Sequence, residues 1–285
     1  MNITLRPGRS DDAAAGGVIC YQAFKTIAEA HAFPADFPVP EIAGEFLAYT
    51  LSRPDVYSVV AEADGRIAGS NFLWIDAGVG GVGPITVDPA LQNGTIGRRL
   101  MEDVLAQAQR RGLASVRLVQ AAYHNRSLSL YARLGFDARE PLSVMQGPAI
   151  GVEIPGYRVR PAVAGDSDAC HRLSFKVHGL HRPEALQAAI AEGAASVVEH
   201  ADRISGYATG LGFFGHAVGE SNEDLKALIG AAAAFAGPGF LLPTRNAGLF
   251  RWCLDKGLRV VQPMTLMSRG LYNEPAGAFL PSILY

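Results

Sequence analysis

The stretch TVDPALQNGTIGRRL, residues 86–100, contains the residue types needed to bind a phosphate. A strand-like run ends at Asp88-Pro89, a polar turn with two glycines follows, and a helical pattern begins near Ile96. The first turn of a helix has unpaired backbone N–H groups and carries about half a positive charge. The turn therefore predicts an anion site, with ordinary glycine-containing strand-to-helix turns as the alternative interpretation.

The wider block, V-D-P-x-x-Q-x-x-x-I-G-R-x-L, resembles the acetyl-CoA-binding motif of the GNAT-type N-acetyltransferase superfamily, V-x-P-x-x-Q/R-x-x-G-x-G/A. Val87, Pro89, Gln92 and Gly97 match this motif. Thr95 replaces its first glycine. The Thr95 backbone N–H remains available, but its Cβ would clash if the position needed a positive φ.

A second block, HNRSLSLYARLGF at residues 124–136, resembles the asparagine-rich turn and helix that follow in the same superfamily. His124 stands where the family usually has asparagine, and Asn125 is the next residue. Tyr131 matches the family tyrosine that protonates the leaving CoA thiolate. A tyrosine packed on an amphipathic helix is the alternative interpretation.

The resemblance implies direct attack of an amine on the thioester of acetyl-CoA, which is a cosubstrate, with no metal. It places the pyrophosphate on residues 92–99 and the pantetheine along strand 85–87 and the asparagine-rich turn. The implied cofactor-binding residues are Ile85, Thr86, Val87, Gln92, Asn93, Gly94, Thr95, Ile96, Gly97, Arg98, Arg99, His124 and Asn125. The general base stays open among Asp76, Glu62 and the carboxylate of Tyr285.

The chain of 285 residues repeats itself in order. ITLRPGRSDDA from Ile3 matches YRVRPAVAGDSDA from Tyr157, and LGFDAREPLSVMQG from Leu134 matches KGLRVVQPMTLMSRG from Lys256. We therefore predict two tandem domains, residues 1–150 and 157–285, separated by a glycine- and proline-rich stretch.

The second repeat lacks the residues that predict a phosphate site in the first. Its corresponding stretch, residues 215–232, has no glycine motif and carries Glu220, Glu223 and Asp224, which would repel a pyrophosphate. The position of Tyr131 is taken by Cys253. We expect a degenerate acetyltransferase-like domain that completes the acceptor cleft or mediates assembly.

Periodicity predicts the elements that position these motifs. Helices are expected at 11–24, 41–53, 96–111 and 126–134, a hairpin at 56–75, and further strands at 82–89, 114–122 and 141–147. The predicted fold class is α/β, with a mixed, mostly antiparallel twisted sheet flanked by helices in each domain. GVGGVG at 78–83 is followed by no helix, so we interpret it as a flexible turn rather than a dinucleotide site.

Bulk composition narrows the partners. The net charge of −2 and the lack of a basic stripe argue against nucleic acid. There is no apolar run of membrane length or signal-peptide core, and three scattered cysteines suit a reducing compartment, so we expect a cytoplasmic protein. The spacing of His171, His178 and His181 along the chain does not match that of standard zinc ligands, so we expect no metal site there.

The acceptor is a small-molecule or peptide amine that the sequence does not identify. The proline-rich segment 33–40 and the phenylalanines near it are expected to wall its site: Phe24, Phe33, Phe37 and Phe46. The apolar tail from residue 276 is expected to pack into a cleft or against a second subunit in a homodimer. The function favoured is N-acetyltransferase; the alternatives are a non-catalytic acyl-CoA sensor and a structural tandem protein.

Overall fold

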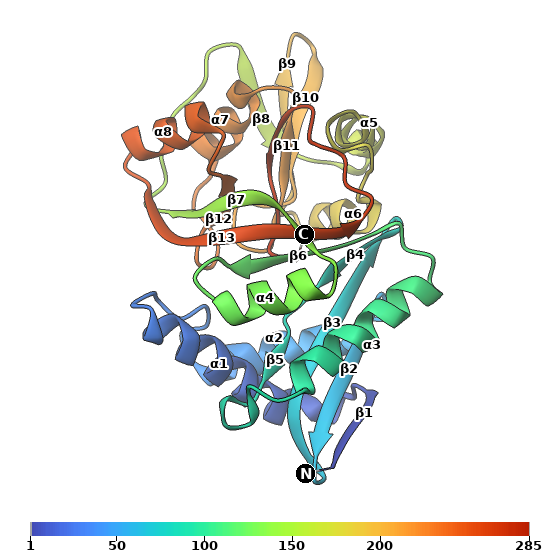
Figure 1. The fold of residues 1–285 in the computed structure, drawn as a ribbon. Helices are drawn as coiled ribbons and strands as arrows, with labels where there is room; N and C mark the ends of the chain where they lie inside the picture. The colour runs from blue at the N-terminus through green and yellow to red at the C-terminus, as the bar shows by residue number, and fades with distance from the viewer. Residues whose placement is uncertain (1, 285) are drawn as a thin grey trace.

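The computed structural model describes residues 2–284 and has a lower, N-terminal unit and an upper, C-terminal unit (Figure 1). The N-terminal unit contains, in order, β1 (Ile3–Pro7), α1 (Ala13–Ala30), α2 (Pro40–Ser52), β2 (Val56–Ala63), β3 (Arg66–Asp76), β4 (Val79–Val82), β5 (Thr86–Val87), α3 (Ile96–Arg110), β6 (Ser115–Ala121), α4 (Asn125–Arg133) and β7 (Asp137–Gln146). The predicted helices and hairpin are confirmed, with boundaries shifted by a few residues.

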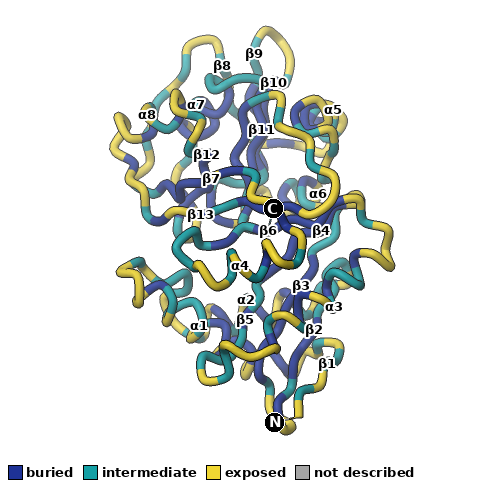
Figure 2. The backbone as a smooth tube through the Cα atoms, viewed as in Figure 1, coloured by how far each residue is buried: buried dark blue, intermediate teal, exposed yellow. Residues whose placement is uncertain are grey.

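Helices cover both faces of the N-terminal sheet. Phe72 of β3 packs with α1 and α2 beside Cys20 and Leu47, whereas the next residue, Leu73, packs with α3 beside Leu100. Neighbouring residues of a strand point to opposite faces. The middle of β3 is therefore buried on both sides, including the polar Ser70 and Asn71, and Figure 2 shows buried residues along this strand.

The C-terminal unit repeats this order. It contains β8 (Tyr157–Pro161), α5 (Ser167–His178), α6 (Pro183–Ala191), β9 (Ser196–His200), β10 (Arg203–Ala208), β11 (Ala217–Gly219), α7 (Asn222–Ala231), β12 (Phe240–Pro243), α8 (Ala247–Asp255), β13 (Arg259–Gly270) and β14 (Ala278–Leu280). Val197 packs with α5 and α6, whereas Val198 packs with α7 and α8. The tandem arrangement of helix-flanked, mostly antiparallel sheets agrees with the prediction, although only the larger sheet is mixed, through the parallel pair of β4 and β6.

One ion pair is repeated with the fold. Arg6 of β1 donates two hydrogen bonds of 2.7 Å to Asp12, and Arg160 of β8 donates bonds of 2.7 and 2.8 Å to Asp166. Each arginine also pairs with a carboxylate on the neighbouring strand, at 2.7 and 2.8 Å. This arrangement fastens the start of the first helix to the first strand in both halves.

The two units exchange their last long strands. The larger sheet has the order β1-β2-β3-β4-β6-β13-β7-β12, so β13 of the C-terminal half lies between β6 and β7 of the N-terminal half. In return, β7 pairs with β12, Leu241 lying opposite Val144. Figure 1 shows β13 crossing the middle of the molecule between strands of the other half. One hydrogen-bonded sheet therefore joins both units.

The structure changes one interpretation and decides between the alternatives of another. Residues 79–82, predicted to be a flexible turn, form the buried strand β4 between β3 and β6. Glycine suits this strand because a Cβ on Gly80 would lie 2.7 Å from the Leu73 side chain and 2.9 Å from that of Leu113. The apolar tail packs into its own chain: β14 pairs with β11, and Ser282 donates a hydrogen bond of 2.8 Å to the carbonyl of Phe214. No helix among residues 2–284 is long and apolar enough to cross a bilayer.

Candidate active site

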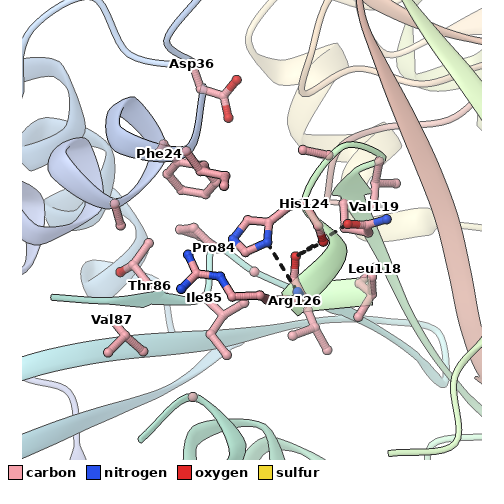
Figure 3. Close-up of a pocket in the computed structure, with 18 of the residues that line it drawn as sticks. Phe24, Asp36, Pro84, Ile85, Thr86, Val87, Leu118, Val119, His124 and Arg126 are labelled. Atoms are coloured by element: carbon pink, nitrogen blue, oxygen red, sulfur yellow. Dashed lines mark hydrogen bonds between the residues drawn. The ribbon is translucent and has the colours of Figure 1, made fainter. Parts of the chain in front are cut away.

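A cavity of about 940 Å³ opens between the two units, and both of the predicted motifs line it (Figure 3). Its walls come from α1 and the segment before α2, from residues 82–98, from the end of β6 and from α4. The C-terminal half adds residues 213–214, 237–238, 264 and 283–284. The predicted site residues that line it are Ile85, Thr86, Val87, Gln92, Asn93, Gly94, Ile96, Gly97, Arg98, His124, Asn125 and Tyr131.

The glycine loop is held by side chains of both motifs. The Gln92 side chain donates a hydrogen bond of 3.0 Å to the carbonyl of Val87, which turns the chain toward α3. Asn93 has a φ of 67°, a left-handed conformation that asparagine tolerates. The Arg126 guanidinium donates to Asn93 at 2.7 Å and to Gln92 at 3.1 Å. Arg126, which sequence reasoning missed, therefore ties the first turn of α4 to this loop.

The N-terminus of α3 opens into the cavity. Gly94 and Gly97 have no crowding neighbour: a methyl group on Gly97 would lie 3.7 Å from Val87 and 3.8 Å from Leu130. Arg98 is exposed beside this turn and pairs with Glu102 at 2.8 Å. Unpaired helix amides with an adjacent guanidinium suit a pyrophosphate.

Two of the predicted cofactor residues do not line the cavity. The side chain of Arg99 donates a hydrogen bond of 2.8 Å to the carbonyl of Ile3, so it fastens α3 to β1 instead. Thr95 is exposed, with a φ of −96°. Because this φ is ordinary for a β-branched residue, the clash considered for Thr95 does not arise.

Polar atoms without partners suit an extended polar ligand beside this loop. Thr86 Oγ1 and Gln120 Nε2 are both buried, both belong to cavity-lining residues, and neither has a hydrogen-bond partner. A buried donor left unpaired costs free energy, so it is usually satisfied by a ligand or water. The pantetheine arm of acetyl-CoA offers amide groups of the required kind.

The Tyr131 side chain lines the cavity from α4 and is 6% exposed. Its ring lies 6.2 Å from that of Phe136, and burial raises the pKa of its hydroxyl. A raised pKa keeps the phenol protonated at neutral pH, which a proton donor requires. The two interpretations of Tyr131 are therefore compatible, because its ring packs beside Phe136 and the residue also lines the cavity.

His124 and Asn125, the two residues that could take the place of the family asparagine, have different positions in the structure. His124 caps α4, because its Nδ1 accepts a hydrogen bond of 3.3 Å from the Ser127 backbone N–H. Burial, and then the nearby Arg126, lower the pKa of the His124 imidazole. Asn125 is exposed at the first position of the helix. The corresponding residue of the second half, Asn246, caps α8 in the same way.

The opposite end of the cavity is apolar. Phe24, Phe37 and Phe46 line it, whereas Phe33, which was expected with them, does not and stacks on Tyr123 with ring centroids 4.4 Å apart. The ring of Phe214, from the C-terminal half, lies 5.1 Å from that of Phe46. The second half therefore completes this end of the cavity.

Asp36 lies among these aromatic side chains and is the second residue that sequence reasoning missed. Burial raises the pKa of its carboxyl, and a hydrogen bond of 3.0 Å from Gln262 Nε2 partly offsets this. Its position between two prolines in HAFPADFPVP, as the one acidic residue of that stretch, was the available signal. Its partner on β13 was not foreseeable, because it depends on the strand exchange.

The carboxylates considered as general base lie elsewhere. Glu62 pairs with Arg6 at 2.7 Å on β2, and Asp76 accepts the backbone N–H groups of Glu184 and Ala185 at the start of α6. Neither lines the cavity. Tyr285 lies outside the described residues.

The second half lacks the anion site at its own loop position. Asp224 accepts hydrogen bonds of 2.8 Å from both the backbone N–H and the hydroxyl of Ser221, so the start of α7 is capped internally. Glu220 pairs with Lys176 and Arg203, which lower its pKa to about 2. Cys253 is buried, and burial raises the pKa of its thiol to about 12, which does not suit a nucleophile.

Among the described residues, no group of three or more histidine, cysteine, aspartate or glutamate side chains has the geometry to hold a metal ion. His171 and His181 lie ring to ring at 5.2 Å, whereas His178 packs on Phe279. Burial lowers the pKa of His178 to about 3. These histidines are packing residues of the C-terminal unit.

Comparisons with known proteins find relatives in sequence and in fold. Residues 21–136 match the sequence model of the acetyltransferase (GNAT) family. The chain is 35% identical over 94 residues to an "IAA acetyltransferase" of Azospirillum brasilense, a match that spans 32% of the chain and 61% of that protein.

Solved structures share the whole fold at low identity. A candidate acetyltransferase of Pyrococcus horikoshii superposes with a TM-score of 0.73 at 17% identity, covering 97% of this chain and 94% of that one. A GCN5-related N-acetyltransferase of Sphaerobacter thermophilus gives 0.62 at 17%, covering 95% and 96%. A tandem GNAT protein from the clavulanic acid biosynthesis pathway gives 0.55 at 13%, covering 99% and 100%. Residues 21–136 therefore resemble the acetyltransferase (GNAT) family in sequence, and the whole chain shares the fold of these solved structures.

Proposed function

We propose that this protein is an N-acetyltransferase that transfers the acetyl group of acetyl-CoA to an amine by direct attack. The observation that carries the proposal is the meeting of two motifs in one cavity. The open N-terminus of α3 and the Tyr131 side chain line the same space, although 34 residues separate Gly97 from Tyr131.

The cofactor residues have distinct proposed tasks. The amides of residues 94–97, with Arg98 and Arg126, hold the pyrophosphate. Thr86 and Gln120 pair with the pantetheine amides through their free polar atoms. Bound acetyl-CoA supplies the acetyl group as an activated thioester.

Tyr131 is the proposed general acid. Its hydroxyl gives a proton to the departing sulfur, and burial, which raises its pKa, keeps that proton in place until then. The N-terminal unit, residues 1–150, supplies the cofactor site and the C-terminal unit, residues 157–285, closes the acceptor end. An acceptor of small-molecule or peptide class remains compatible with this assignment.

Two measurements test the proposal. Calorimetry with acetyl-CoA is expected to show binding that the Gly97→Asp variant abolishes, because a carboxylate there repels the pyrophosphate. A thiol-release assay across a panel of amines is expected to show turnover. Absence of acetyl-CoA binding at millimolar concentration would refute the assignment, and binding with no turnover of any amine would favour an acyl-CoA sensor.

A further inference from the structure

The acceptor end of the cavity combines one carboxylate with an apolar wall. Asp36 is the only acidic residue among the described residues that line the cavity. Apart from Tyr123, whose hydroxyl is bonded to Gln262, the side chains that surround this end are apolar: Phe24, Ile27, Phe37, Ile42, Phe46, Phe213, Phe214, Met264, Ile283 and Leu284.

The cationic side chains of the lining lie at the other end. Arg98, on α3, and Arg126 and Arg133, on α4, belong to the two motif helices. Asp36 forms no ion pair with any residue in the described part of the chain, and its environment is set by burial and by Gln262. The cavity is thus divided by charge, with anion-binding groups around the glycine loop and one carboxylate at the apolar end.

Gln262 orients this carboxylate from the other half of the chain. Gln262 is 1% exposed on the exchanged strand β13, and it accepts a hydrogen bond of 3.0 Å from the Tyr123 hydroxyl while donating to Asp36 Oδ1. The second oxygen of Asp36 accepts no hydrogen bond from the residues the structure describes. One face of the carboxylate is therefore held, and the other is available to a ligand.

We propose that the acceptor is a small, apolar primary amine of the arylalkylamine class, whose ammonium group is bound and deprotonated by Asp36. This inference rests on the proposed function. Figure 3 shows Asp36 beside Phe24, where an ammonium on the carboxylate would place an attached ring among the phenylalanines. An ammonium over aromatic faces gains additional attraction.

The proposed proton and electron movements balance. Asp36 takes one proton from the ammonium, and the freed nitrogen lone pair forms the N–C bond to the acetyl carbon. The C–S bond breaks and its electron pair leaves with sulfur, which Tyr131 protonates. The second proton of the nitrogen restores the Tyr131 phenol, and the proton on Asp36 passes to solvent.

The lining disfavours other amines. An amino acid would bring a carboxylate to an end of the cavity that has no cationic side chain. A polyamine would leave further ammonium groups without a carboxylate, and a peptide would leave backbone amides without partners. Burying such groups unpaired costs free energy.

Binding of the acceptor provides the first test. With CoA present, calorimetry of wild-type protein and 2-phenylethylamine is expected to give a measurable Kd, which Asp36→Asn weakens about 100-fold. The Kd for acetyl-CoA should not change in this variant, which also shows that it is folded. The matched control is Asp11→Asn, because Asp11 is exposed and lies outside the cavity lining. No binding of the amine by wild-type protein, or equal binding by Asp36→Asn, would overturn the inference.

Specificity provides the second test. Turnover should favour 2-phenylethylamine and tryptamine over phenylalanine, spermidine and a phenylalanyl dipeptide in kcat/KM. A preference for any of the last three overturns the inference but leaves the proposed function in place, since transfer from acetyl-CoA would still occur. Absence of acetyl-CoA binding would instead refute the proposed function.

Gln262 is a positioning residue, and the pH profile tests its role. The titratable groups around Asp36 are Cys20 on α1 and Tyr123, whose ring lies 5.2 Å from that of His31 in a tilted arrangement. The hydrogen bond from Gln262 lowers the pKa of Asp36, so Gln262→Leu should move the acid limb of kcat/KM to higher pH. Gln262→Glu, protonated at low pH, should restore part of the activity there. An unmoved acid limb in Gln262→Leu would contradict a role through Asp36.

Discussion

The side-chain amide of Gln262 donates a hydrogen bond of 3.0 Å to the carboxylate of Asp36, across 226 residues of chain. Gln262 reaches this position because β13 lies in the sheet of the N-terminal half, between β6 and β7. The exchanged strand therefore completes the sheet and also orients a carboxylate at the apolar end of the cavity.

The strand exchange predicts that the two halves do not fold separately. Residues 1–150 expressed alone lack β13, so β6 and β7 lose their shared neighbour and expose unpaired edges. We expect this fragment to aggregate, and co-expression with residues 151–285 to restore a soluble complex. Co-purification and thermal melting would check this. A monomeric 1–150 fragment with a cooperative melt would contradict it.

The variant Tyr131→Phe is expected to lower kcat without changing the affinity for acetyl-CoA. The ring still fills its buried site beside Phe136, so stability and the Kd for acetyl-CoA should stay close to wild type. Loss of the proton donor should lower kcat about 100-fold or more. Steady-state kinetics with a substrate amine, together with calorimetry, give both quantities. Unchanged kcat under conditions where chemistry limits turnover would remove Tyr131 from the mechanism.

Gly97→Ala is expected to weaken acetyl-CoA binding without destabilising the fold. The added methyl group has ordinary contact distances, 3.7 Å to Val87 and 3.8 Å to Leu130, and alanine favours a helix. The same methyl group narrows the approach of a phosphate to the helix amides, so we expect about tenfold weaker binding. The matched control is Gly44→Ala in α2, where a Cβ has no neighbour within 4 Å. Equal affinities in the two variants would place the phosphate elsewhere.

Arg126→Gln should loosen the glycine loop. It removes charge-assisted hydrogen bonds to Gln92 and Asn93, one of which holds a residue in the left-handed conformation. Each such bond contributes about 1.5 kcal/mol or more, so the Kd for acetyl-CoA should rise by about tenfold or more. Arg110→Gln, which affects an exposed arginine paired with Gln107, is the control. Stronger binding in Arg126→Gln than in the control would exclude this role.

The repeated arginine–aspartate pairs predict loss of stability in acid. Hydrogen bonds from Arg6 and Arg160 lower the pKa values of Asp12 and Asp166. A lowered pKa stabilises the fold above the unfolded value of about 4, and this contribution is lost as pH falls through the folded pKa. The melting temperature should therefore drop between roughly pH 4 and pH 2.

The double variant Asp12→Asn, Asp166→Asn should melt lower at pH 7 and show a flatter acid dependence. Asp137→Asn serves as its control, because the side chain of Asp137 is 70% exposed. If the melting temperature of the double variant falls with pH as steeply as that of wild type, the loss of stability comes from other carboxylates, such as Glu220, whose pKa is lowered to about 2.

The sequence by itself predicted the elements and which two motifs line the cavity. The spacing of Gln92, Gly97 and Tyr131 predicted the loop, the helix start and the α4 position, because each depends on local turn chemistry and helical period. The repeat predicted the tandem fold. The lack of a phosphate motif near Glu220 and Asp224 predicted the loss of the second loop's chemistry, and the structure pairs or buries these acids.

Only the tertiary structure decided which strands pair and which residues meet at the apolar end of the cavity. β7 and β13 have similar burial patterns, with consecutive buried residues in each, so the pattern does not determine whether the neighbour of either strand is β6 or β12. Because Asp36 meets Gln262, and Phe46 meets Phe214, only after the strands are exchanged, neither pair follows from local sequence. The acceptor end is thus a property of the joined sheet.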